Sequence, residues 1–87
     1  MHDTFLLNRI SEALIELCHK DRIIRITKLR IITNQDSHIQ QGNLYEHLLE
    51  NNKGLVGKWT EIIIDKQNIE NLTAVIESIE GETLEQQ

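Results

Sequence analysis

The chain contains only one cysteine and three aromatic residues, and each scarcity limits what the protein can be. A single thiol, Cys18, allows neither an internal disulfide nor a cysteine-based zinc site, which fits a reducing cytoplasm. Because Phe5, Tyr45 and Trp59 are the only aromatic residues, a core must be built mainly from isoleucine and leucine. There is no apolar run of the roughly 18 residues that span a bilayer, and no signal peptide. We therefore expect a cytoplasmic protein without a membrane partner.

The overall charge is acidic, with a formal net charge of −5. Such a chain is not expected to bind nucleic acid. Basic residues nevertheless gather between Lys20 and Arg30, in a segment without interleaved aromatic residues. Alternation would spread these charges over a strand, so we expect a solvated strand face that could contact an acidic protein.

Hydrophobic periodicity predicts two helices and three strands. An apolar stripe at three- and four-residue spacing indicates the first helix, and alternation indicates the first strand, with Thr27, Leu29, Ile31 and Thr33 on its covered face. Gly54 suits a left-handed backbone position after the second helix. The expected helices cover 3–20 and about 40–51, and the expected strands cover 25–33, 60–65 and 72–79.

These elements predict an α+β fold of two layers, with both helices on one face of a three-stranded sheet and the order α-β-α-β-β. Residues 66–71 have about the length of a hairpin loop between the last two strands. We expect one domain over 1–80 and an acidic tail over 81–87. A core of this size gives modest stability, so homodimer formation would help.

The tripeptide Met1-His2-Asp3 is the segment with the clearest possible chemistry. The amine of Met1, the amide nitrogen of His2 and its imidazole can close two fused chelate rings around one ion. Such roughly planar nitrogen sites favour Ni(II) or Cu(II). By itself the tripeptide favours the simpler interpretation of an exposed terminus that binds nothing.

Met1-His2-Asp3, the amphipathic helix, the segment 26–32, a helix near 40–51 and the closing Ser78-Ile79-Glu80 together resemble the HypA/HybF family of nickel metallochaperones. The resemblance implies Ni(II) binding through Met1, His2 and Asp3. It also implies delivery to a [NiFe]-hydrogenase large-subunit precursor, or to urease, with help from a nickel-insertion GTPase.

The sequence departs from the family at three places. The paired Cys-x-x-Cys motifs of the family's zinc ribbon are replaced by residues 66–71, so no zinc is expected. Asp3 stands where the family has glutamate, and Gln40 stands where it has an acidic residue at the second helix. Asp36 and His38, from the same turn as Gln40, are candidate substitutes as auxiliary ligands.

No phosphate loop, zinc-protease helix or nucleophile elbow is present, so we do not expect an enzyme. Cys18 lies on the apolar stripe and is expected to be buried, whereas His47, between two glutamates, is expected at the surface. An alternative function is a degenerate HypA-like interaction or scaffold module without functional metal binding. The recipient enzyme, the oligomeric state and the preference for nickel over copper do not follow from the sequence.

Overall fold

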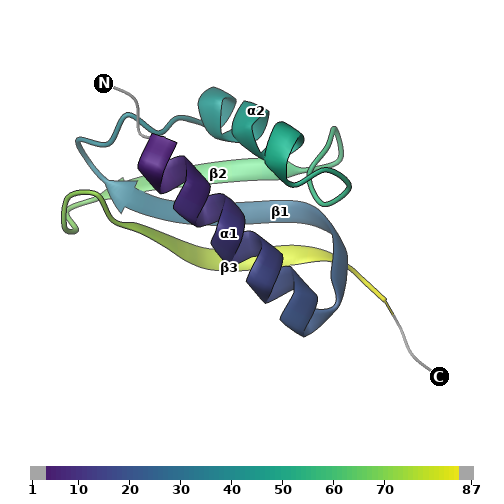
Figure 1. Ribbon diagram of the computed structural model, residues 1–87. Coiled ribbons are helices and arrows are strands. Elements are labelled where there is room, and N and C mark those ends of the chain that lie inside the picture. Colours follow the sequence, from purple (N-terminus) through teal and green to yellow (C-terminus); the bar gives the residue numbers. More distant parts are fainter. Residues whose placement is uncertain (1–3, 85–87) are drawn as a thin grey trace.

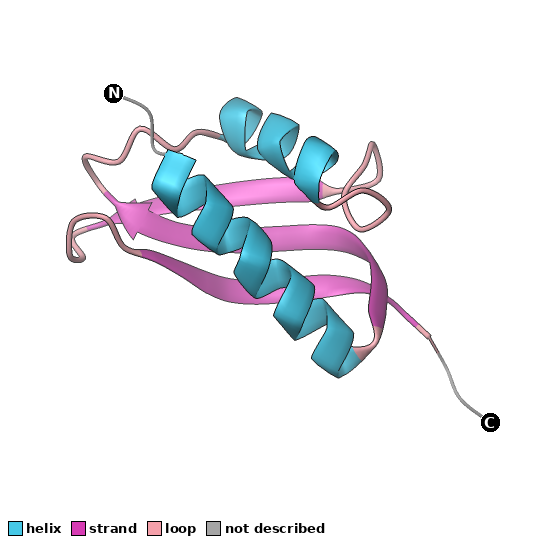
Figure 2. Ribbon diagram, in the orientation of Figure 1, coloured by secondary structure: helices cyan, strands magenta, loops and turns pink. Residues whose placement is uncertain are grey.

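In the computed structural model, which describes residues 4–84, two helices lie on one face of a three-stranded sheet (Figure 1; Figure 2). The elements are α1 (Thr4–Asp21), β1 (Ile23–Asn34), α2 (Gln41–Asn51), β2 (Glu61–Gln67) and β3 (Ala74–Thr83). The predicted α+β fold, its element order and the placement of both helices on one face are confirmed. Neither helix in this part of the chain is long and apolar enough to cross a membrane.

The sheet has the order β2-β1-β3, with β1 parallel to β2 and antiparallel to β3. Parallel neighbours need a crossover connection, which α2 provides between β1 and β2. The expected hairpin between the last two strands is wrong, because β1 lies between them. The connection from β2 to β3 instead passes the end of β1, where the side-chain amide of Asn34 donates to the carbonyl of Ile69.

The buried face of β1 differs from the predicted one at a single position. Leu29, Ile31 and Thr33 are fully buried, as expected from alternation. The register with β3 is irregular between Ile26 and Lys28, so Ile26 is the residue that turns toward the helices. Thr27 instead donates its hydroxyl to a backbone carbonyl of β3 at 3.1 Å.

The core lies between the helices and the sheet and is almost entirely aliphatic. Its members come from every element except β3 and from the two loops flanking α2: Leu6, Ile10, Leu14, Cys18, Ile26, Leu29, Ile31, Ile39, Leu44, Leu48, Val56 and Ile62. Ser11 and Asn52 add a buried polar link between the helices, because Ser11 Oγ donates to Asn52 Oδ1 at 2.6 Å and Asn52 Nδ2 donates to the Ser11 carbonyl at 3.2 Å. These two side chains therefore satisfy one another, which limits the cost of their burial.

The start and end of α2 agree with the prediction, whereas β3 is longer than predicted. Gln40 precedes α2 and donates its backbone N–H to Asn43 Oδ1 at 2.9 Å. Gly54 has a φ of 88°, which confirms the predicted left-handed position. β3 continues to Thr83 and pairs with the first residues of β1, so 81–83 belong to the sheet rather than to the expected tail.

Candidate metal centre

Met1, His2 and Asp3, the predicted nickel ligands, lie outside the described residues. The described structure begins with the next residue in the chain, and the surroundings of that residue can be examined. That residue is Thr4, at the start of α1, which Figure 1 shows beside the loop from β1 to α2.

The first turns of α1 and this loop line one shallow cavity of about 320 Å³. Leu6 contributes from α1, and Asp36 and His38 contribute from the loop. Asn71 and Leu72, in the connection from β2 to β3, line the same cavity. The cavity therefore lies at the start of α1, with Asp36 and His38 among its lining residues.

Hydrogen bonds to Asn34 and Ser37 organise the loop that holds these two side chains. The carbonyl of Asn34 accepts from the N–H of Ser37 at 2.9 Å, and its side-chain oxygen accepts from the N–H of Asp36 at 2.8 Å. Ser37 Oγ accepts from the N–H of Ile39 at 3.1 Å, and the Ile39 side chain is fully buried. The turn is thus held by the end of β1 on one side and by the core on the other.

Gln40, the third auxiliary candidate, does not line this cavity. It lines a different one along β2, with Ile62 and Ile64. Its helix-capping partner Asn43 donates its side-chain amide to the carbonyl of His38 at 3.1 Å. The structure therefore groups Asp36 and His38 with the start of α1 and places Gln40 in the α2 cap.

Within residues 4–84, no three His, Cys, Asp or Glu side chains are grouped so that they could hold a metal ion. Asp36 and His38 can contribute an oxygen and a nitrogen, which suits a supplementary role at a borderline ion.

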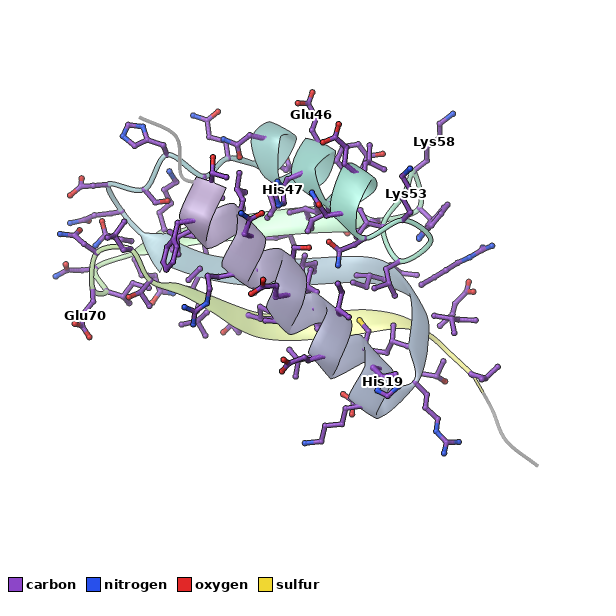
Figure 3. The ribbon with its side chains drawn as sticks, in the orientation of Figure 1. His19, Glu46, His47, Lys53, Lys58 and Glu70 are labelled. Carbon is purple, nitrogen blue, oxygen red and sulfur yellow. The ribbon has the colours of Figure 1, made fainter. Side chains whose placement is uncertain are left out.

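Two other residues with possible metal or acid–base chemistry are accounted for by the packing. Cys18 is buried, as expected, and burial together with the charge of Asp21 raises the pKa of its thiol. This environment opposes a thiolate ligand. His47, expected at the surface, is half-buried: its ring lies on the side of α2 that faces α1, and Nε2 is buried without a hydrogen bond to a described residue (Figure 3). His47 follows Leu44 by three residues, which places it at the border of the buried stripe formed by Leu44 and Leu48.

Comparison of the chain with known family models, with curated proteins and with solved structures finds no match.

Proposed function

We propose that the protein binds one Ni(II) ion per chain through Met1, His2 and Asp3 and delivers it to an enzyme precursor. The observation that carries this proposal is the cavity in which α1, immediately after the tripeptide, meets Asp36 and His38. Nickel is the cargo of the protein in this proposal, so a site that is open to solvent and to a recipient suits the task.

The chemistry of the donor set supports nickel over zinc. An amine, an amide nitrogen and an imidazole in two fused rings impose a nearly planar arrangement, which Ni(II) and Cu(II) accept and tetrahedral zinc does not favour. Asp3, Asp36 or His38 would complete the coordination. Protons compete for each nitrogen, so nickel binding should strengthen as the pH rises.

The resemblance to the HypA/HybF family supports a particular recipient. On that basis we propose a [NiFe]-hydrogenase large-subunit precursor as the acceptor, or urease, with a nickel-insertion GTPase as the helper. The thiolates of the family's zinc ribbon are absent from the sequence, so no step of this function would depend on zinc.

The decisive variant is His2→Ala in a protein whose amino terminus carries no tag. We expect it to abolish nickel binding, because it removes the imidazole and opens one chelate ring. Isothermal titration calorimetry with Ni(II) near pH 8 measures the loss, and weak d–d absorption bands report the planar nitrogen environment.

His19→Ala is the matched control, because it removes an imidazole at the opposite end of α1 (Figure 3). It should bind nickel like the unaltered protein. Asp36→Asn and His38→Ala should each weaken binding by about tenfold if their side chains complete the site. Unchanged affinity in His2→Ala would refute the assignment of the site.

A second candidate function is an interaction or scaffold module that binds no metal. The surroundings of Gln40 favour this second function. Gln40 stands where the HypA/HybF family has an acidic residue, and here it belongs to the α2 cap and lies outside the cavity lined by Asp36 and His38. Complementation of a hydrogenase-maturation defect separates the two functions. Full activity of folded His2→Ala and Asp3→Ala variants would support the scaffold, and loss of activity would support nickel delivery.

A further inference from the structure

The fold gives different surroundings to the five basic residues that cluster between positions 20 and 30, as judged from contacts within residues 4–84. On the open face of the sheet, Arg30 lies 3.9 Å from a carboxylate oxygen of Asp65 and 3.6 Å from one of Glu77. Lys28 is paired in register with an acidic residue on each neighbouring strand, Glu61 and Glu80. Arg30 therefore has carboxylate partners within the sheet, and Lys28 has acidic register neighbours on both sides.

Arg25 is engaged in another way. Its guanidinium lies 4.9 Å from the centroid of the Trp59 ring, which is a cation–π distance. The Trp59 ring also covers Gly57 so closely that a Cβ at that glycine would meet ring atoms at 2.4 Å. Arg25 thus packs against a fixed aromatic surface.

Lys20 and Arg22 remain, and they lie together at the carboxyl end of α1. With His19 they line an open cavity of about 590 Å³ whose apolar lining includes Ile24 and Leu84. These two apolar side chains are 49% and 56% exposed. Within residues 4–84, the three basic side chains form no ion pair with a carboxylate, including that of neighbouring Asp21.

The helix dipole explains only part of this arrangement. Cations in the last turn of a helix are stabilised by its negative end, which accounts for His19 and Lys20. Arg22 lies beyond the helix with a φ of 60°, a left-handed conformation that glycine or asparagine adopts at lower cost. Backbone hydrogen bonds to His19 and Leu84 hold this conformation, but they do not require a long cationic side chain beside exposed Ile24 and Leu84. The choice of arginine at a position that glycine or asparagine would fill at lower cost is a reason to look for a binding role.

We propose that this cavity, which we call the α1-end cleft, binds an acidic segment of a partner protein. An aliphatic side chain of the segment would lie against Ile24 and Leu84, and carboxylates on either side of it would pair with Lys20 and Arg22. Charge complementarity argues for a short peptide segment. The net charge of −5 repels extended polyanions, whereas a short segment interacts with the cations within a Debye length of about 8–10 Å.

Fluorescence polarisation with a labelled Glu-Asp-Leu-Glu-Asp peptide and the full chain, in nickel-free buffer, tests the proposal separately from the metal site. We expect saturable binding that weakens as salt is raised. Lys20→Glu and Arg22→Glu should each weaken it at least about tenfold, because each converts an attraction into a repulsion. Lys58→Glu is the matched control, since it changes the net charge equally on an exposed side chain away from the cleft (Figure 3).

Two further comparisons separate loss of binding from loss of stability and show which features of the peptide are needed. Arg22→Gly relieves the left-handed strain, so this variant should melt at a higher temperature while binding the peptide more weakly. The peptides Gln-Asn-Leu-Gln-Asn and Glu-Asp-Gly-Glu-Asp, which lack the charges or the apolar side chain, should bind more weakly than the probe.

Three results would overturn the proposal. The first is equal binding by the folded charge-reversal variants and the unaltered protein. The second is equal binding of the uncharged peptide. The third is tighter binding of phosphatidylserine vesicles or of polyuridylic acid, lost in Lys20→Glu and Arg22→Glu, which would assign the cleft to a membrane or to nucleic acid instead.

Discussion

Cys18 is 2% exposed on the buried face of α1, and its ionisation couples to folding. Burial, with a contribution from Asp21, raises the pKa of the thiol in the folded protein. As the pH rises, the unfolded chain loses the thiol proton first, so the native state then binds more protons than the unfolded state. The free energy of unfolding should therefore fall as the pH rises through the pKa of the unfolded thiol.

Urea unfolding between pH 7 and pH 10 measures this effect by comparison with Cys18→Ala. The variant lacks the titrating group, so its stability should fall less over the same range. The native thiol should also react with a disulfide reagent at least about tenfold more slowly than the thiol of the urea-unfolded chain. Parallel pH profiles, or equal reaction rates, would contradict the buried and neutral thiol.

The burial of Cys18 was predictable because it follows from helical spacing alone. The conformations of Arg22 and Leu72 were not, since both have a φ near 60° and neither is a residue type that favours this region. At these two positions, contacts with neighbouring segments of the fold outweigh the preference of the residue for a negative φ. At Arg22, for example, the carbonyl is held by the N–H of Leu84 at 2.8 Å.

At the scale of elements, the pairing of β1 with β3 requires a glycine at one point. Gly81 lies opposite Ile26, and a Cβ at Gly81 would meet the carbonyl oxygen of Arg25 at 2.0 Å. A backbone atom cannot rotate away, so Gly81→Ala should lower the free energy of unfolding by about 1–3 kcal/mol. Chemical denaturation monitored by circular dichroism measures the loss.

Gly42→Ala is the opposing control for this prediction, because a Cβ there would have no atom within 4 Å. Gly42 lies in the first turn of α2, where alanine should raise the free energy of unfolding by about 0.5–1 kcal/mol. Equal effects of the two substitutions would show that the close approach at Gly81 does not exist in solution.

The kinds and order of the elements were predictable because periodicity is a local property of the sequence. The order of the strands was not, because the position of β1 between β2 and β3 depends on pairs far apart in the chain. The register irregularity at Thr27 likewise depends on how β3 lies against β1, and it decided which side chain entered the core. The extension of β3 through Gly81 to Thr83 has the same origin, since an acidic sequence gives no sign of the partner that pairs with it.

At the scale of the whole molecule, α1 separates the proposed metal centre from the α1-end cleft. The helix has 18 residues, which corresponds to a length of about 27 Å at 1.5 Å per residue. The sequence placed Asp36 and His38 in one turn, but their approach to Leu6 depends on the packing of α1 across the sheet. The cleft was not predictable at all, because it depends on which of the clustered cations form no ion pair with a carboxylate of residues 4–84.

This separation predicts that nickel and an acidic peptide bind independently. The two sites share no described residue, and the helix between them is held against the sheet by a buried aliphatic core. The affinity for Ni(II) should therefore change by less than about twofold when the Glu-Asp-Leu-Glu-Asp peptide saturates the cleft, and by linkage the peptide affinity should be equally insensitive to nickel. Arg22→Glu should likewise bind nickel like the unaltered protein, and His2→Ala should bind the peptide normally. A larger coupling, equal in both directions, would show that α1 moves as a unit when either site is filled, and that the partner bound at the cleft controls the release of the ion.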